Sequence, residues 1–175
     1  MFEEQLIVDT NIWAWSLALT RDINDIVTLA QANFEHEVDG IFLTDPDYYA
    51  WRLDLACTNQ RHNLAAEQII VARHKITDQL MAYAWCGRGE RTPYSQEELA
   101  EAKMLHLDMN LSSRQRMKIC AEAISHWQTW ATACGCAVLI STSIRSDQRG
   151  FMRLHERMGF TLRGSIGYKR LKEQQ

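Results

Sequence analysis

The sequence predicts an α/β fold in which helices flank a mixed central sheet. Two observations predict this class. Runs of β-branched and aromatic residues alternate with amphipathic helical patterns along the chain. Glycines also stand where three helical patterns end, at Gly40, Gly135 and Gly159. The length of 175 residues is usual for one domain, so we expect a single domain over residues 1–175.

In the first half, residues 1–103, short apolar patches over 5–19 predict one or two strands. A helix is expected from Thr20 to Gly40, because Thr20-Arg21-Asp22 provides an N-cap and apolar residues then recur at helical spacing. A second helical region follows Pro46, since proline suits the first turn of a helix. Two β-branched runs, turning over 75–78, then predict a hairpin of strands 68–73 and 79–86.

The segment 87–103 is polar, begins with Gly-Arg-Gly-Glu and contains Pro93. It ends in a short helical pattern over 95–100. We therefore interpret it as an insertion between two strands.

In the second half, residues 104–175, a strand is expected at 104–111, followed by a long amphipathic helix from Ser112-Ser113 to Gly135. The apolar run 137–141 lies between helix and turn signals, as a buried strand does. The remaining segments predict a helix at 147–158 and a pair of strands at 160–171 that turns near 164–167.

Composition argues against several classes of function. With 19 basic and 22 acidic residues, the net charge of −3 implies no bulk attraction to nucleic acid or to an anionic membrane. No stretch reaches the roughly 20 apolar residues of a membrane span, and the N-terminus does not resemble a secretory signal. Five cysteines without paired metal-ligand spacing indicate reduced thiols, no metal site and a cytoplasmic location.

The run Arg153-Leu154-His155-Glu156-Arg157-Met158-Gly159-Phe160 resembles a motif in the last helix of the GNAT N-acetyltransferases. That family commonly has Leu, Tyr or His, Glu, Lys, Leu, Gly and Phe there, and the element order from Leu105 to Leu171 is also similar. The resemblance implies a mostly antiparallel sheet and transfer of acetyl from acetyl-CoA to an amine. It also implies that residues 1–103 carry the acceptor-side helices and residues 104–175 bind acetyl-CoA.

The resemblance implies an acetyl-CoA site at the start of the long helix, where free N–H groups and the helix dipole favour a pyrophosphate. The family pattern of Arg or Gln, two residues, Gly, one residue, Gly or Ala falls on Gln115, Lys118 and Cys120. Positive charge crowded into the first turn would be relieved by a nearby anion. The candidate cofactor-binding residues are Ser113, Arg114, Gln115, Arg116, Met117, Lys118, Ile119, Cys120 and Gln148.

The resemblance also suggests catalytic groups. His155 stands where the family often has a tyrosine that protonates the departing thiolate, and an imidazole could do the same near neutral pH. The alternative is a histidine packed against the sheet. For the base that deprotonates the amine, the candidates are His106 and Asp108 on the central strand, with Glu67 or His74 across the sheet.

A second hypothesis comes from the residues at the family's glycine positions. Glycine there lets backbone approach the phosphates closely, whereas this chain has Lys118 and Cys120. This favours a GNAT-like fold kept as a structural or interaction protein, such as a bacteriophage virion component, since several phage proteins resemble degenerate members of the family. In that case Arg114, Arg116 and Lys118 would bind a protein partner, and the chain would reside in a virion.

Overall fold

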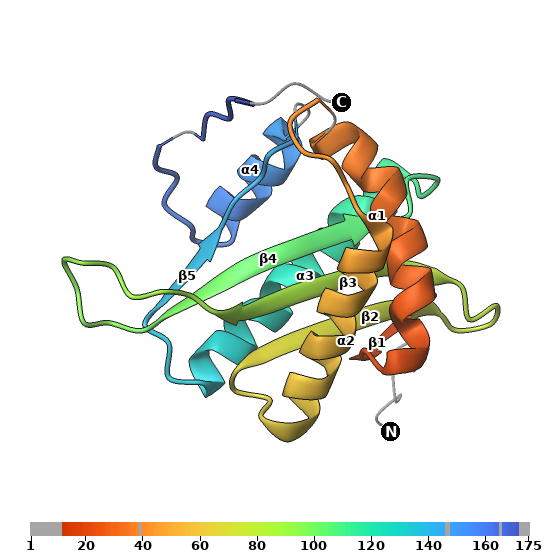
Figure 1. Ribbon diagram of the computed structural model, residues 1–175, viewed down its shortest axis with the longest axis horizontal. Helices are drawn as coiled ribbons and strands as arrows, with labels where there is room; N and C mark the ends of the chain where they lie inside the picture. The colour runs from red at the N-terminus through yellow and green to blue at the C-terminus, as the bar shows by residue number, and fades with distance from the viewer. Residues whose placement is uncertain (1–11, 39, 146–147, 165, 172–175) are drawn as a thin grey trace, which may run out of the picture.

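A five-stranded sheet covered by helices on both faces forms the centre of the protein. The computed structural model describes residues 12–38, 40–145, 148–164 and 166–171. Helices α1 and α2 cover one face of the sheet and α3 covers the other (Figure 1). The elements in chain order are β1 (Trp13–Leu17), the 3-10 turn η1 (Thr20–Asp22), α1 (Ile23–Glu37), α2 (Pro46–His62), β2 (Glu67–His74), β3 (Leu80–Arg88), β4 (Leu99–Leu107), α3 (Ser113–Ala133), β5 (Val138–Ser141) and α4 (Arg149–Arg157).

The strands lie in the order β1-β2-β3-β4-β5, as in the sequence. The first three pairs are antiparallel, and only β4 and β5 are parallel, joined by the crossover helix α3. The predicted class, a mixed and mostly antiparallel sheet flanked by helices, is confirmed. The predicted hairpin is confirmed as β2 and β3.

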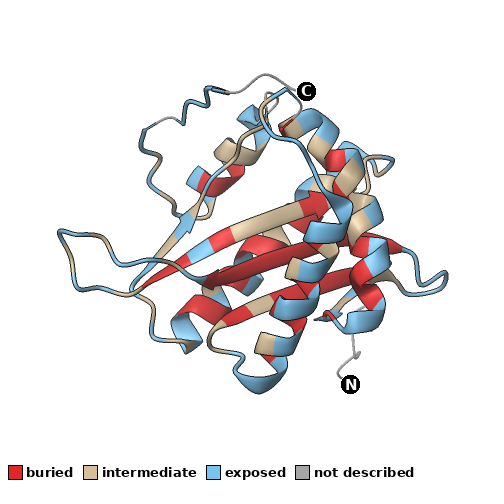
Figure 2. Ribbon diagram, in the orientation of Figure 1, coloured by how far each residue is buried: buried red, intermediate tan, exposed pale blue. Residues whose placement is uncertain are grey.

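Strand β3 is the centre of the core because helices cover it on both faces. Its first eight residues are all buried, and the strand is drawn as a continuous red ribbon in Figure 2. Neighbouring side chains point to opposite faces of a strand. Tyr83 accordingly packs with Ile26 and Leu53 beneath α1 and α2, whereas Ala84 packs with Trp127 on the α3 side.

Two helix ends have the local features that the sequence favours. The Asp45 side chain accepts a hydrogen bond from Tyr48 N at 2.9 Å directly before Pro46. Just after the C-terminal end of α3, Gly135 has a positive φ of 75°, a conformation that costs glycine little. The helix predicted over 20–40 is confirmed over Ile23–Glu37 as α1, preceded by the 3-10 turn of Thr20–Asp22.

The predicted short helix over 95–100 is wrong, because these residues lie in a loop and at the start of β4. Strand β4 also begins five residues earlier than predicted, at Leu99. Buried Ala100 pairs with Arg88 of β3, and Arg88 also forms an ion pair with Glu98. Pairing with the sheet has therefore overridden the local helical preference.

The predicted strand pair at 160–171 is also wrong for the residues described there, 160–164 and 166–171, none of which lies in a strand. Strand β5 consequently forms the edge of the sheet. Val138 and Ile140 remain 41% and 39% exposed, so the prediction of a buried strand is wrong as well. The strand predicted within residues 5–11 and the helical start predicted at Asp147 lie outside the described residues.

The structure also bears on membranes and cysteines. In the described parts of the chain, no helix has the length and apolar character needed to cross a membrane. All five cysteines are free thiols.

Leu53 provides a test of the packing between α2 and the sheet. Leu53→Ala should lower the free energy of unfolding by about 2–5 kcal/mol, because this side chain is 0% exposed and its removal leaves a cavity. The matched control is Leu55→Ala on the same helix, where 40% exposure limits the loss to about 1 kcal/mol. Urea unfolding measures both, and equal losses would contradict the packing described here.

Candidate active site

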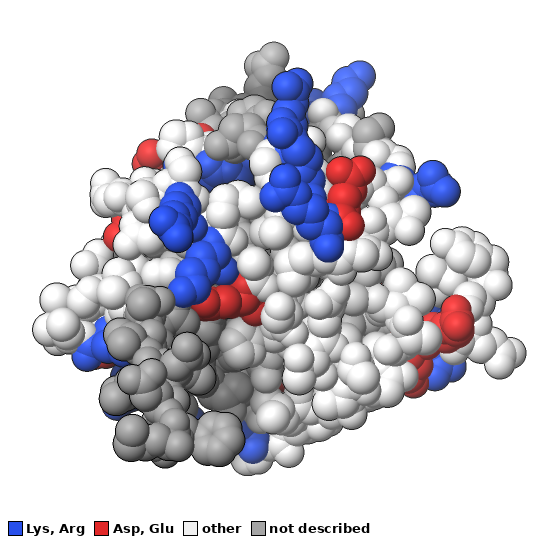
Figure 3. Space-filling model, turned by 180° about the vertical axis from the view of Figure 1, so that it is seen from behind, with Lys and Arg blue, Asp and Glu red and all other residues white. Residues whose placement is uncertain are grey.

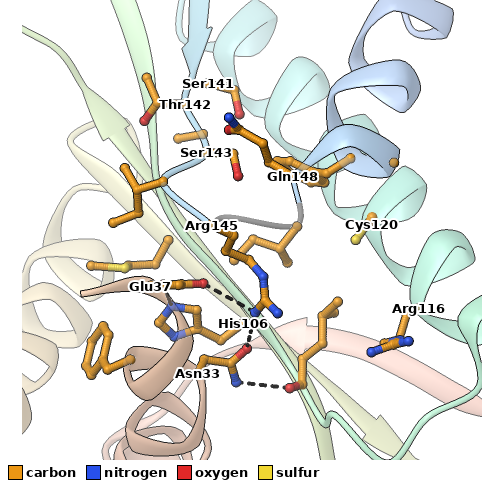
Figure 4. A pocket seen from close by; sticks show the side chains of 18 of the residues that line it. Asn33, Glu37, His106, Arg116, Cys120, Ser141, Thr142, Ser143, Arg145 and Gln148 are labelled. Carbon is orange, nitrogen blue, oxygen red and sulfur yellow. Dashed lines mark hydrogen bonds and ion pairs between the residues drawn. The ribbon is translucent and has the colours of Figure 1, made fainter. Parts of the chain in front are cut away.

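Strands β4 and β5 separate, and a cavity lies between them. They pair only from Leu99 with Val138 to Ala102 with Ser141, while β4 continues to Leu107. The cavity has a volume of about 450 Å³, within the usual range for small-molecule sites. Its walls come from the second half of β4, the segment after β5, the first half of α3, the start of α4 and the end of α1 (Figure 4).

The separation leaves one backbone edge of β4 facing the cavity. Asp108 N donates to Met81 O of β3 at 2.8 Å, whereas Leu107 O accepts from Asn33 Nδ2 at 3.0 Å on the opposite edge. Alternate residues of a strand direct their N–H and C=O groups to the same edge. The backbone N–H and C=O of Leu105 therefore also face away from β3, on the side of β4 that β5 no longer pairs with.

A carboxylate and an imidazole meet at the α1 end of the cavity. His106 Nε2 lies 2.9 Å from Glu37 Oε2, and the two side chains are only 2% and 9% exposed. Arg145 Nη1 lies 3.6 Å from Glu37 Oε1 and donates to Asn33 Oδ1 at 3.3 Å. Figure 4 shows these four side chains converging from α1, β4 and the segment after β5. The cluster can bind a cation or exchange a proton.

Two buried tyrosines continue this cluster behind His106. Tyr83 Oη lies 2.6 Å from His106 Nδ1 and 2.7 Å from Tyr49 Oη. Burial raises the pKa of both phenols above the ordinary value of 10, so both keep their protons. His106 is thus contacted on both ring nitrogens by groups from other elements.

The start of α3 brings positive charge to the opposite wall. Arg116 lines the cavity, and Figure 4 shows it extending from α3 toward the centre. The face seen from behind gathers Lys and Arg side chains in its upper half (Figure 3). On α4, Arg149, Arg153 and Arg157 are exposed at four-residue spacing. Positive charge is therefore concentrated locally on α3 and α4, although the whole chain is slightly acidic.

Of the nine residues predicted to bind the cofactor, the cavity brings together five. Ser113, Arg116, Met117, Cys120 and Gln148 line it. The other four, Arg114, Gln115, Lys118 and Ile119, are not among the lining residues.

Three of those four have contacts elsewhere. Gln115 closes a capping box with Ser112, accepting from Ser112 N at 3.0 Å. The Lys118 ammonium lies 5.3 Å from the centroid of the Trp13 ring, and Ile119 is fully buried beside Trp13. The Lys118 side chain therefore leaves the cavity open, contrary to the obstruction that its place in the sequence suggested.

Two polar groups in the cavity wall have unusual environments. Burial raises the pKa of Cys120 to about 12, and the nearby Arg116 and Arg145 offset this only in part, so the thiol stays protonated. Among the described residues, the buried indole Nε1 of Trp127 has no hydrogen-bond partner. An unpaired buried donor costs about 1–3 kcal/mol.

Solved acetyltransferase structures share the fold of this chain. Aminoglycoside 6′-N-acetyltransferase AAC(6′)-Ih from Acinetobacter baumannii aligns with a TM-score of 0.66 and 15% identity, covering 93% of this chain and 99% of that one. Glucosamine-6-phosphate N-acetyltransferase from Arabidopsis thaliana aligns with a TM-score of 0.68 and 10% identity over 93% and 100%. The chain has the fold of the GNAT acetyltransferases.

A third GNAT structure, AAC(6′)-Iy in complex with the bisubstrate analogue CoA-S-monomethyl-acetylneamine, aligns with a TM-score of 0.68 and 10% identity over 93% and 99% of the two chains. Neither the comparison with protein-family models nor that with curated protein sequences finds a match. The likeness therefore lies in the arrangement of the GNAT fold rather than in the sequence.

The three candidate catalytic residues lie at different places relative to the cavity. His106 lines it, as described above. Asp108 lies beyond the end of β4, where its carboxylate accepts from Asn110 N at 2.9 Å and from Gln79 Nε2 at 3.0 Å. His155 is 1% exposed, and its ring nitrogens contact Phe151 O at 2.9 Å and Ser141 Oγ at 2.8 Å. The cavity lining thus includes only His106 of the three.

The contacts of His155 define its protonation. Its Nδ1–H donates to the Phe151 carbonyl, so Nε2 accepts from the Ser141 hydroxyl in the neutral ring. Burial lowers the pKa of His155 below its ordinary value of 6.5, and the bond to Phe151 offsets this only in part. This arrangement joins α4 to β5, as the alternative of a packed histidine expects.

Several lining residues were not predicted from the sequence, notably Glu37, Asn33, Arg145 and the hydroxyl run 141–143. A partial signal exists for Asn33 and Glu37, because their four-residue spacing puts them on one side of a helix. Arg145 had no comparable signal, since it contacts Glu37 across 108 positions of the chain. The combination arises only when α1 packs beside the end of β4.

The environment of His155 predicts a pH dependence of stability. A histidine with a lower pKa in the folded state binds fewer protons than in the unfolded state just below pH 6.5. The stabilisation that neutral His155 gives to the folded state is therefore fully present above pH 6.5, and it is lost as the pH falls toward the folded-state pKa. We expect the unfolding free energy to drop between pH 7 and 5.5, and His155→Gln to reduce this slope. His62→Gln, at an exposed position of α2, is the control that should keep it. Denaturant titrations over this pH range measure the slope.

Proposed function

We propose that this protein is an N-acetyltransferase that transfers acetyl from acetyl-CoA to a primary amine. The observation that carries the proposal is the opening between β4 and β5, with a backbone edge on one side and Glu37 with His106 at its end. An extended acyl donor fits the first part, and a cationic acceptor fits the second.

The residues of the cavity suit the chemistry of coenzyme A. Its extended arm carries amide groups that can exchange hydrogen bonds with the Leu105 backbone, as a strand would. Arg116 and the N-terminus of α3 suit its pyrophosphate, because cations and free N–H groups both favour a phosphate. When bound, acetyl-CoA would supply the thioester carbonyl that the amine attacks.

The side chains favour direct transfer to the amine. Cys120 keeps its proton and is a poor nucleophile, so it does not favour an acyl-enzyme route. The Glu37–His106 pair can accept a proton from a bound ammonium, after which the nitrogen lone pair forms the N–C bond as the C–S bond breaks. The departing sulfur takes the second proton lost from the nitrogen. Most of the rate enhancement then comes from holding amine and thioester together.

The similar structures support an amine on a polar molecule as the acceptor. Their names give aminoglycosides and glucosamine 6-phosphate as substrates of those proteins. In this chain the acceptor end of the cavity has a buried carboxylate, which suits the positive charge of an amine. The acceptor therefore belongs, in this proposal, to the class of cationic primary amines.

Isothermal titration with acetyl-CoA tests donor binding. Wild type should release heat at micromolar concentrations, and Arg116→Ala should weaken binding roughly 10- to 100-fold through loss of a charge-assisted contact. Lys118→Ala is the matched control on the same helix turn, since its ammonium lies over Trp13, and it should bind like wild type. Absence of heat with wild type at high micromolar acetyl-CoA would exclude the proposed function.

The six tryptophans provide a second readout of donor binding. The indole cross-peak of Trp127 in a ¹H–¹⁵N spectrum should move when acetyl-CoA is added, because this side chain lines the cavity that the cofactor would occupy. Trp130 Nε1 already donates to Leu64 O at 2.7 Å, so its cross-peak should stay in place. A Trp127→Phe sample assigns the peak. Movement of both peaks would indicate a general change rather than a contact at Trp127.

An exposed apolar stripe on α2 supports a second candidate function, assembly with a protein partner. Tyr48, Trp51 and Leu55 are 57%, 55% and 40% exposed at helical spacing, and the first two rings lie 5.6 Å apart. If acetyl-CoA does not bind and light scattering finds an oligomer that Trp51→Ser dissociates, a structural role, including one in a virion, becomes the better proposal.

A further inference from the structure

Four side chains from four elements form a continuous hydrogen-bonded chain that leads from the core to the cavity. Tyr49 of α2 contacts Tyr83 of β3 at 2.7 Å, Tyr83 contacts His106 of β4 at 2.6 Å, and His106 contacts Glu37 of α1 at 2.9 Å. Tyr83 and His106 are 0% and 1% exposed, so water does not compete for these bonds. The direction in which each group donates determines which of them can take up a proton.

The tyrosines define that direction. Each hydroxyl has one hydrogen to donate, and Tyr83 has two neighbours, Tyr49 Oη and His106 Nδ1. Within the described residues, Tyr83 is the hydrogen-bond partner of the Tyr49 hydroxyl. If Tyr83 donated to Tyr49, the buried hydrogen of Tyr49 would have no acceptor, which is costly. Tyr49 therefore donates to Tyr83, and Tyr83 donates to His106 Nδ1.

This direction determines the tautomer of His106. Because Nδ1 accepts from Tyr83, the neutral ring carries its proton on Nε2, and Nε2–H donates to Glu37 Oε2. Both ring nitrogens are then occupied, one as an acceptor and one as a donor. His106 has no lone pair left with which to accept a proton from a ligand in the cavity.

The second oxygen of Glu37 is directed differently. Oε1 lies 3.6 Å from the Arg145 guanidinium, and Asn33 Oδ1 lies 3.3 Å from the same nitrogen. Nη1 of Arg145, a cationic nitrogen, therefore already lies beside Glu37 Oε1. Asn33 is itself held by donating to the carbonyls of Leu29 and Leu107, so its oxygen keeps its direction.

We infer that Glu37, rather than His106, takes the proton from the acceptor amine, and that Tyr83 is a positioning residue that keeps His106 donating to Glu37. The inference rests on the proposed function. One proton passes from the ammonium to Glu37 and later to solvent. The nitrogen lone pair then forms the N–C bond, and the C–S bond breaks with its electron pair on sulfur, which takes the second proton.

Long-range ¹H–¹⁵N spectra of histidine-labelled protein test the tautomer without any substrate. We expect the neutral ring of wild-type His106 to carry its proton on Nε2, and Tyr83→Phe to shift the Nδ1 signal because it deletes the donor to Nδ1 while keeping the ring. Tyr48→Phe is the matched control, since that ring is exposed on α2 and outside the chain. A proton on Nδ1 in wild type, or an unchanged His106 signal in Tyr83→Phe, would overturn the inference.

Thiol release from acetyl-CoA, with neamine and glucosamine 6-phosphate as acceptors, tests the role of Glu37. Glu37→Gln should lower kcat by roughly 10²- to 10⁴-fold, as expected for loss of a general base, and leave acetyl-CoA binding unchanged. Tyr83→Phe should lower kcat about 10-fold at constant KM for acetyl-CoA, as expected for a lesser effect on the same proton transfer. A Glu37→Gln protein with the wild-type rate would refute the assignment. If wild type binds no acetyl-CoA, the proposed function fails, whereas the spectra still decide the tautomer.

Discussion

The separation of β4 from β5 after Ala102 and Ser141 is the constraint on which the candidate site depends. Up to that point the two strands form a parallel pair. Beyond it, β4 pairs with β3 on one side and has no strand on the other among the described residues. A strand that loses its neighbour leaves backbone groups without partners, which is unfavourable in a protein interior unless something else satisfies them. Here Asn33 satisfies Leu107 O, and the edge at Leu105 faces a cavity large enough for a ligand.

The rest of the fold supports this opening from both sides. On one face, α1 packs with α2 against β3 and directs Glu37 and Asn33 to the end of β4. On the other, α3 buries Ile124 and Trp127 against the sheet while its first turns direct Arg116 and Cys120 into the cavity. The opening thus has the Glu37 carboxylate at one end and Arg116 in its opposite wall, a polarity that suits the proposed pairing of an ammonium with an anionic acyl carrier.

Burial of the polar cluster around His106 costs free energy of folding, and contacts with neighbouring elements offset that cost. Burying Glu37, His106 and two tyrosine hydroxyls is unfavourable unless each has a partner. Three successive hydrogen bonds, from Tyr49 through Tyr83 and His106 to Glu37, provide those partners from elements far apart in the sequence. Such a network has one well-satisfied arrangement of its protons, so it can direct a proton to a particular atom. This is why the tautomer of His106 follows from the packing of α2, which does not itself line the cavity.

The sequence by itself determined the fold class, most element positions and several helix ends, because these depend on local patterns: apolar periodicity, caps such as Asp45 and glycines such as Gly135. It also indicated the start of α3 and His106 as parts of a site. Only the tertiary structure decided which residues of that helix face the cavity, since Arg116 and Lys118 have similar chemistry but point to different neighbours. It likewise decided that residues 99–100 join β4, that residues 160–164 and 166–171 add no strand, and that Glu37 meets His106. The physical reason is the same in each case, because pairing and contact between distant segments are properties of the packed chain and leave no local signal.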